Sequence, residues 1–316
     1  MSTSQSSPEI SRSRDCAECP TEPVLERIAS RVAEIGEGFS IRRALPNRQR
    51  RMVGAWCFLD HAGPVDYARG KGLNVGPHPH IGLSTVTYLF EGGFRHRDST
   101  GADQFISPGD VNWMTAGIGV THSERTTTET KAHPHKAFGI QTWVALPESA
   151  EDSPARFEHA AKANLPMLEA EGVKLRLILG TAFGQRAPVT TSSEMFYADV
   201  ELAPGAQVPL PDDHEDRGVY VAQGSIEVAG QRFEGNQMMV FRPGDRLAVR
   251  AGPAGARLLL LGGATLEGPR HIWWNFVASS RERIEAAKEA WRAGDFHHGR
   301  FHLPPGDDGE FIPRPP

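Results

Sequence analysis

Short apolar and β-branched runs alternate with turns that contain glycine and proline, and this pattern dominates the chain from Phe39 to Leu146. Runs of this length with such punctuation predict β-strands. The predicted strands of this block span residues 52–59, 84–90, 103–106, 110–114 and 138–145. Short strands at this spacing, with turns at 91–93, 107–110 and 116–119, predict an all-β sandwich or small barrel.

A second block repeats the pattern after a polar stretch that starts at Glu148. Its predicted strands span residues 173–179, 193–202, 218–221, 225–228, 237–241, 247–250 and 257–261. A Pro-Gly-Asp turn between two β-rich runs occurs at 108–110 and again at 243–245, which indicates an internal duplication. The predicted parts are an N-terminal arm (1–38), a first β domain (39–147), a linker (148–170), a second β domain with a terminal helix (171–303) and a tail (304–316).

Two helices are expected outside the strands. Strong helix formers continue from residue 285 to 293, and Glu282 follows Ser279 by three residues, as a capping box requires. This predicts the helix that ends the second β domain. A shorter helix is expected from about Pro23 to Glu34, because proline is tolerated in a first helical turn. The tail from residue 304 is rich in Pro, Gly and Asp and has too little apolar content to fold alone.

Composition excludes several classes of partner. A chain of 316 residues with 39% hydrophobic residues suffices for about two domains that each bury a core. Its 34 basic and 39 acidic residues give a net charge of −5, so we expect neither a nucleic acid partner nor a membrane surface. No apolar run approaches the roughly 20 residues that span a bilayer, and the polar N-terminus does not resemble a signal peptide. We therefore expect a cytoplasmic protein.

The three cysteines are typical of a reducing compartment and predict no disulfide framework. Cys16 and Cys19 form a CxxC without a second such pair, and we interpret them as a chance pair in the arm. Cys57 lies in an apolar run, where a small buried side chain is expected.

Two short peptides carry the candidate chemistry: His78-Pro79-His80 and His122-Ser123-Glu124. In a β-strand, side chains at i and i+2 project from the same face, so each peptide would present two metal-binding groups together. Three imidazoles and a carboxylate suit Fe, Mn, Ni, Co, Cu or Zn better than Ca or Mg. A lone histidine on a strand is more often an ordinary hydrogen-bonded residue. The strand and turn signals between the two peptides, which can bring both pairs together, favour a metal site.

Other histidines and basic residues have plainer interpretations. His133 and His135 lie in a polar segment without a partner pair, and we expect a solvated loop near a pocket mouth. His214-Glu215 precedes a predicted strand, but no second HxE peptide follows the turn at 243–245, so the second domain is expected to hold no metal. His96 and Arg97 are expected to border the metal pocket, Trp273 and Trp274 to pack in a core, and the arginines between residues 42 and 51 to be solvated.

The same residues resemble a known family. Gly72 followed by His78-Pro79-His80 looks like the first cupin metal motif, and residues 107–110 with His122 look like the second. Residues 58–60, 77–92, 108–124 and 139–144 resemble pirins more closely. The resemblance implies a bicupin of two stacked jelly-roll-type β-barrels. It implies a metal, usually iron, in the N-terminal barrel only, with His78, His80, His122 and Glu124 as ligands. The ordinary cupin glutamate after HxH is absent, since Ser84 and Thr85 occupy that region.

The expected chemistry depends on open coordination. An octahedral Fe²⁺ with four protein ligands keeps two positions for substrate or O₂. A flavonol or enediol would lose a proton to Glu124, the expected catalytic residue, or to a neighbouring base, and then react with O₂. Some pirins resemble quercetin 2,3-dioxygenase, which implies cleavage of a flavonol with loss of carbon monoxide. The alternative is a redox-responsive regulator that binds a transcription or metabolic protein, with the arginines between residues 42 and 51 as the only candidate surface.

Overall fold

A computed structural model describes residues 24–35 and 39–315. Cys16 and Cys19 and most of the predicted arm lie outside this range. The described chain divides into two compact units. The unit called here the N-terminal barrel contains residues 31–35, 39–46, 55–164 and 266–315, and the C-terminal barrel contains residues 24–30, 47–54 and 165–265. The all-β fold with a short C-terminal helix agrees with the prediction.

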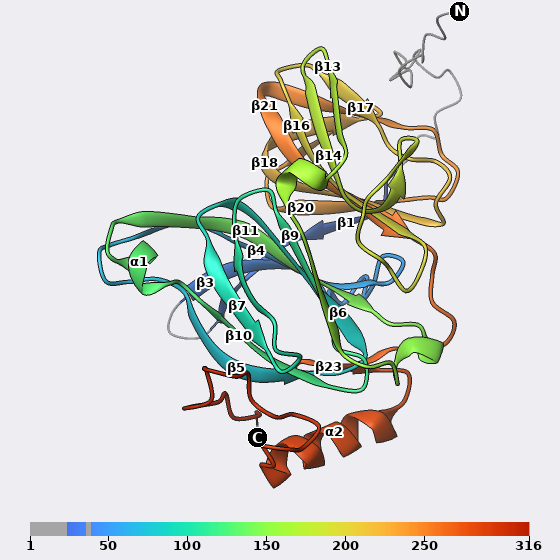
Figure 1. Ribbon diagram of the computed structural model, residues 1–316. Coiled ribbons are helices and arrows are strands. Elements are labelled where there is room, and N and C mark those ends of the chain that lie inside the picture. Colours follow the sequence, from blue (N-terminus) through green and yellow to red (C-terminus); the bar gives the residue numbers. More distant parts are fainter. Residues whose placement is uncertain (1–23, 36–38, 316) are drawn as a thin grey trace, which may run out of the picture. The chain divides into compact units, whose positions relative to one another are not determined.

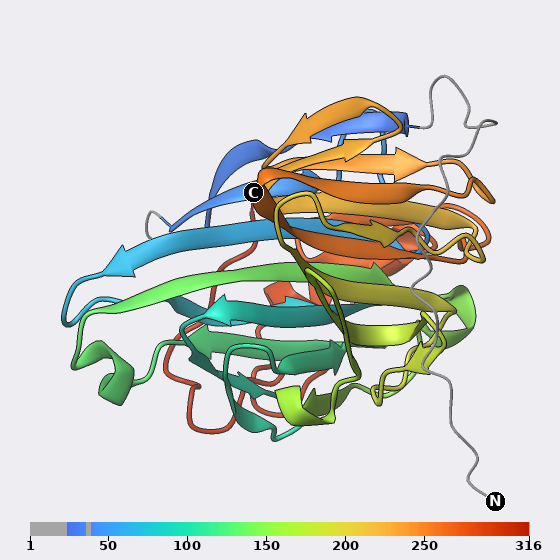
Figure 2. The same ribbon diagram turned by 90° about the horizontal axis from the view of Figure 1, so that it is seen from above.

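Two sheets form the N-terminal barrel (Figure 1). A seven-stranded sheet has the order β12-β9-β6-β11-β4-β3-β2, and a four-stranded sheet has the order β5-β10-β7-β8. The long strands β4 and β11 run side by side in Figure 2 and pair antiparallel. The strands are β2 (Arg31–Ile35), β3 (Phe39–Leu45), β4 (Trp56–Tyr67), β5 (Asn74–His80), β6 (Leu83–Glu91), β7 (Phe94–Asp98), β8 (Asp103–Ile106), β9 (Val111–Thr115), β10 (Val120–Arg125), β11 (His135–Ala145) and β12 (Arg156–Ala160).

Shorter elements complete this unit. They are α1 (Thr128–Lys131), η1 (Glu148–Ala150), η2 (Lys162–Asn164), the hairpin β22 (His271–Trp273) and β23 (Phe276–Ala278), and α2 (Arg281–Ala293). Helix α2 buries Ile284, Ala287 and Trp291 in a cluster that also contains Ile81 and Phe276. The sequence pattern grouped this helix with the second β domain, whereas its contacts group it with the N-terminal barrel.

The C-terminal barrel is one ten-stranded sheet with the main order β1-β20-β18-β21-β16-β14-β13. Its strands are β1 (Val24–Ala29), β13 (Met167–Ala170), β14 (Val173–Ala182), β15 (Gln185–Arg186), β16 (Met195–Leu202), β17 (Gln207–Pro209), β18 (Asp216–Val228), β19 (Gln231–Glu234), β20 (Gln237–Phe241) and β21 (Ala248–Gly263). Alternate residues such as Leu175, Phe196 and Leu260 point inward and form a continuous apolar core.

The prediction of a helix from about Pro23 to Glu34 is wrong. The described part of this segment forms β1 and β2 instead, and β1 pairs with β20 through Arg27 opposite Met239. Pairing with a distant strand overrides a weak local helix propensity.

The C-terminal helix is confirmed, but its cap is displaced by one residue. Ser280, not Ser279, is the N-cap, and its hydroxyl accepts a hydrogen bond from the Arg283 N–H. Ser279 donates its N–H and hydroxyl to the Glu151 carboxylate. No helix of the described residues combines the length and the apolar character needed to cross a membrane.

Candidate metal centre

Strand register brings the two histidine peptides together. In the four-stranded sheet, β10 pairs with β5, and His122 lies opposite His78 while Val120 lies opposite His80. Pro77 and Pro79 are compatible with β5 because this strand lies at the edge of its sheet. A bulge between His122 and Glu124 shifts the register before the carboxylate. The i, i+2 geometry expected for both peptides is therefore the geometry of paired strands.

Three buried imidazoles converge. Ligand-capable nitrogens of His78, His80 and His122 all lie within 4.8 Å of one another, and His80 Nε2 lies 3.1 Å from His122 Nε2. The His78 and His80 Nδ1 atoms lie 2.9 Å and 3.1 Å from the carbonyl oxygens of Gly76 and Asn275. A carbonyl only accepts hydrogen bonds, so both Nδ1 atoms carry the proton and both Nε2 atoms keep a lone pair. Such a group can hold a transition metal.

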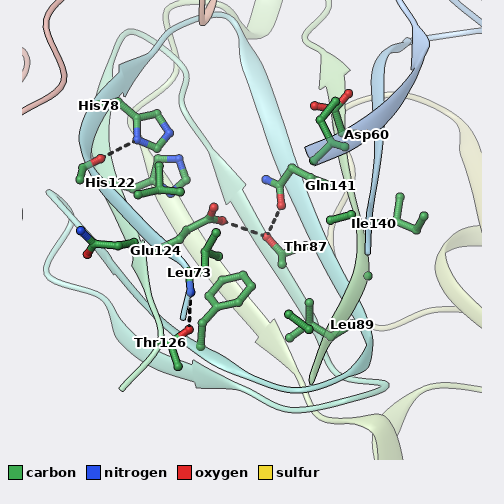
Figure 3. A pocket seen from close by; sticks show the side chains of 18 of the residues that line it. Asp60, Leu73, His78, Thr87, Leu89, His122, Glu124, Thr126, Ile140 and Gln141 are labelled. Atoms are coloured by element: carbon green, nitrogen blue, oxygen red, sulfur yellow. Dashed lines mark hydrogen bonds between the residues drawn. The ribbon is translucent and has the colours of Figure 1, made fainter. Parts of the chain in front are cut away.

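Glu124 lies beside this group rather than within it. Its carboxylate groups with His96 and His122, all within 4.8 Å of one another, and lines the same cavity as the three histidines (Figure 3). Thr87 Oγ1 lies 3.4 Å from Glu124 Oε1 and 2.9 Å from Gln141 Oε1. The structure thus places all four predicted residues at one site, and their role as ligands remains a prediction.

Burial controls the charge of these groups. Desolvation lowers the pKa of His78 to about 4, against the opposing effect of its bond to the Gly76 carbonyl. The pKa of His80 and the pKa of His122 are well below the ordinary value, mainly through burial and then through neighbouring histidines. Burial raises the pKa of Glu124, which His96 and the Thr87 hydroxyl partly counteract. The imidazoles are therefore neutral at pH 7, as metal ligands must be.

The site opens into a cavity of about 650 Å³. Phe58 and Trp143 stack with ring centroids 3.9 Å apart, and the Trp143 and His80 rings form a T-shaped contact with centroids 5.2 Å apart. Further apolar lining residues are Ile41, Leu73, Leu89, Phe94, Phe138 and Ile140. A mostly apolar cavity with a few convergent polar groups is typical of a small-molecule site.

A second polar group lines the cavity away from the histidines. Arg43 donates from Nε and Nη2 to the two carboxylate oxygens of Asp60 at 2.7 Å and 2.6 Å, and its guanidinium lies over the Phe58 ring. Figure 3 shows Asp60 on the side of the cavity opposite His122 and Glu124. Asp60 is 1% exposed, and burial raises its pKa although Arg43 opposes the shift.

The C-terminal tail also lines the cavity, through Glu310, Phe311 and Ile312. Arg125 pairs with Asp307 at 2.6 Å and with Glu310 at 2.7 Å, and the Ile312 N–H donates to the Pro77 carbonyl at 2.8 Å. Sequence reasoning missed this contribution. The tail is held by long-range ion pairs that its Pro-, Gly- and Asp-rich composition does not reveal.

The other singled-out histidines separate into different environments. His133 is exposed in a turn, while His135 begins β11 and lines the cavity, where a loop was expected. His214 lies in the C-terminal barrel and pairs with Glu194. Among the described residues, the groups of three or more metal-capable side chains lie in the N-terminal barrel. His96 is buried against His122, which goes beyond its expected place at the pocket border.

Comparison with known proteins identifies relatives over most of the chain. The pirin family model matches residues 38–144, and the model of the pirin C-terminal cupin domain matches residues 197–297. A pirin-like protein of Caulobacter vibrioides is 47% identical over 88% of this chain and 94% of its own length. The crystal structure of quercetin 2,3-dioxygenase from Acinetobacter baumannii is 36% identical, with a TM-score of 0.84 over 92% of this chain and 95% of that one.

A more distant structure shares the fold alone. The bacterial pirin from Escherichia coli in complex with nickel(II) is 17% identical, with a TM-score of 0.60 over 76% of this chain and 99% of that one. The two cupin domains expected from the sequence are thus confirmed.

Proposed function

Because the chain belongs to the pirin family, we propose that it is a metal-dependent oxidoreductase that cleaves flavonols as quercetin 2,3-dioxygenase does. The observation that carries the proposal is the convergence of three neutral imidazoles on an aromatic cavity of about 650 Å³. Cavities of roughly 300–1,000 Å³ suit ligands of this size. The name of the Acinetobacter relative supports the same reaction.

The proposed ligands are His78, His80, His122 and Glu124, and the proposed metal is Fe²⁺. The donor set also accepts Mn, Ni, Co, Cu or Zn, and nickel is the metal bound in the Escherichia coli pirin. When bound, the metal supplies exchangeable positions and Lewis acidity toward the oxygens of the flavonol and toward O₂.

Apolar side chains hold the planar substrate and exclude water. The stacked rings of Phe58 and Trp143 line the cavity next to His80. A flavonol ring placed against this apolar wall replaces water around the reacting atoms, which strengthens each polar contact there.

Glu124 is the proposed general base. Burial raises its pKa, and this brings its basicity closer to that of a flavonol hydroxyl than an exposed carboxylate would be. One carboxylate oxygen of Glu124 takes the proton of the 3-hydroxyl group. The Thr87 hydroxyl, 3.4 Å from Glu124 Oε1 and 2.9 Å from Gln141 Oε1, orients the carboxylate. The resulting flavonolate is electron-rich and reacts with O₂: two C–O bonds form, at C2 and C4, and the O–O, C2–C3 and C3–C4 bonds break. Carbon C3 leaves as carbon monoxide with its own oxygen, both atoms of O₂ stay in the ester acid that is formed, and Glu124 returns the proton to that product.

Arg43 and Asp60 are proposed to bind the hydroxyl groups of the ring farthest from the histidines. Both side chains line the cavity, and their bidentate pair is held in place by the Phe58 ring. A carboxylate oxygen has capacity for a further hydrogen bond from a phenolic hydroxyl. This favours polyhydroxylated flavonols over unsubstituted ones.

The test uses protein purified without a histidine tag and loaded with Fe²⁺. Anaerobic addition of quercetin should shift the flavonol absorbance, and admission of air should bleach it and release carbon monoxide. A spectrum that stays unchanged under both conditions would refute the proposed activity.

The regulator alternative receives less support from the structure. Two of its five arginines are engaged within their own units: Arg43 with Asp60, and Arg50 with Asp216 and Glu26. Retention of a protein partner by only the ferrous or only the ferric form would favour it over the enzyme.

A further inference from the structure

We propose that His96 and Asp98 are positioning residues that fix the tautomer of His122, so that the His122 Nε2 lone pair points at the metal. The inference rests on the ligand role proposed for His122, but not on the identity of the substrate. The three histidines differ in the group that contacts their Nδ1 atom. Backbone carbonyls set the tautomers of His78 and His80, whereas the Nδ1 atom of His122 faces another imidazole.

Strand pairing places these groups on one face. Strands β7 and β10 are antiparallel neighbours, with His122 opposite Asp98 and Glu124 opposite His96. Directly opposed residues of two antiparallel strands project from the same side of the sheet. The HxD peptide of β7 therefore lies against the HxE peptide of β10 along the whole length of both motifs.

Asp98 determines the protonation of its neighbour. Its Oδ1 accepts hydrogen bonds from the Thr100 N–H at 2.8 Å, the Thr100 hydroxyl at 2.6 Å and the Ala102 N–H at 3.2 Å. Its Oδ2 lies 3.0 Å from His96 Nε2. An ionised carboxylate only accepts hydrogen bonds, so His96 carries a proton on Nε2, and in the neutral form of the ring Nδ1 then keeps a lone pair.

The position of the His122 proton follows from the contact of His122 with His96. Its Nδ1 lies 3.4 Å from His96 Nδ1, which is an acceptor, so His122 carries its proton on Nδ1. The His122 Nε2 then keeps its lone pair toward His80 Nε2, 3.1 Å away. The order of groups is carboxylate, imidazole, imidazole and metal site, which extends the carboxylate–histidine–metal arrangement by one ring.

Burial makes this chain of contacts effective. Asp98 is 0% exposed, His96 is 2% exposed and His122 is 1% exposed. The Phe157 ring stacks on His96, with centroids 4.6 Å apart and an interplanar angle of 22°. Hydrogen bonds in such an environment are stronger than in water, and a group that loses its partner there is costly.

The substitution Asp98→Asn should reverse the direction of the hydrogen bonds from residue 98 through His96 to His122 while conserving the size of the side chain. The oxygen of the introduced amide would keep the backbone N–H bonds, and the amide nitrogen would then donate to His96 Nε2. His96 would carry its proton on Nδ1, and His122 would be left protonated on Nε2, where the metal should bind. Loss of such outer-shell partners weakens metal binding by roughly 10- to 100-fold.

Asp110→Asn is the matched control. Asp110 also accepts backbone N–H bonds, from Ser107 at 3.1 Å and from Lys162 at 2.8 Å, and lies 3.9 Å from His159 Nε2. It belongs to the same barrel, and none of these contacts joins its carboxylate to the three converging histidines. Both variants remove one negative charge, so a difference between them reports the position of the charge.

The first measurement is the dissociation constant of Co²⁺ for the full-length protein, obtained by chelator competition. We expect Asp98→Asn to weaken binding by roughly 10- to 100-fold and to alter the visible Co²⁺ bands, with Asp110→Asn within about threefold of the wild type. Near-UV circular dichroism verifies folding. Equal Co²⁺ affinity in Asp98→Asn and Asp110→Asn would overturn the proposal.

The second measurement needs no variant. Two-bond ¹H–¹⁵N correlation spectra of histidine-labelled, metal-free wild type should place the proton of His96 on Nε2 and that of His122 on Nδ1. A proton on His96 Nδ1 would overturn the inference, as would direct binding of Co²⁺ by His96. If the tautomers are as expected but flavonol is not turned over, the proposed function is refuted and this inference stands. If flavonol is turned over but the tautomers are the opposite ones, this inference is refuted and the proposed function stands.

Discussion

His80 Nε2 lies 3.1 Å from His122 Nε2 inside a buried site, and the His80 Nε2 carries no proton because its Nδ1 donates to the Asn275 carbonyl. Two imidazole lone pairs at this distance repel each other unless a proton or a cation lies between them. Burial keeps the pKa of both rings well below the ordinary value, so a proton between them would belong to a neutral His122 with its proton on Nε2. With the His122 proton on Nδ1, as proposed above, two lone pairs face each other, and this arrangement suits a cation.

The acid stability of the metal-free protein should reflect the buried histidines. The pKa of His78 is about 4 in the folded chain and about 6.5 when unfolded, so the unfolded state binds more protons between these values. The free energy of unfolding should therefore rise as pH increases from about 4 to 6.5. Urea unfolding in EDTA measures it, and His78→Asn should give a shallower dependence. A wild-type curve that falls with pH over this interval would contradict the burial argument.

Substitution of the proposed base should separate metal binding from turnover. In Glu124→Gln, the three imidazoles remain, so most of the Fe²⁺ content should persist, while kcat for quercetin should fall by roughly 10²- to 10⁴-fold. Metal analysis and O₂ consumption measure the two quantities. Glu129→Gln, in the first turn of α1, serves as the control. Turnover by Glu124→Gln at the wild-type rate would remove Glu124 from the mechanism.

Asp60→Asn tests recognition of the distant ring. Loss of a hydrogen bond to a charged group should raise the KM for quercetin by about tenfold. The KM for 3-hydroxyflavone, which lacks hydroxyls on its other rings, should change far less. The ratio of the two KM values is the measured quantity, because it cancels any general effect on folding. An equal rise for both substrates would mean that Asp60 acts only through its ion pair with Arg43.

The tail should loosen when its ion pairs are removed. Asp307→Asn breaks a partly buried, bidentate contact with Arg125, whereas Glu310→Gln breaks a pair whose carboxylate is 63% exposed. Exposed pairs contribute little, so Asp307→Asn should have the larger effect. Hydrogen exchange of the Ile312 amide, which donates to the Pro77 carbonyl, should accelerate about tenfold in Asp307→Asn. Unchanged exchange would show that other contacts hold the tail.

The sequence sufficed for the class of fold and for the pairs of candidate ligands, because both depend on local spacing. The strand β8 (Asp103–Ile106) matches its prediction, and the histidines of residues 78 and 80 share a face, as alternation requires. Long-range relationships were not accessible. The pairing of β1 with β20, the contact of Arg125 with the tail, and the contact between His96 and His122 all depend on which distant segments of the chain meet.

The most direct test of the central claim is the anomalous scattering of crystals grown from tag-free protein, recorded at the absorption edge of the metal found by elemental analysis. We predict one strong peak in the N-terminal barrel, within about 2.3 Å of Nε2 of His78, His80 and His122 and near the Glu124 carboxylate. A peak elsewhere, or no peak in protein that was supplied with Fe²⁺, would contradict the assignment of these residues as the metal centre.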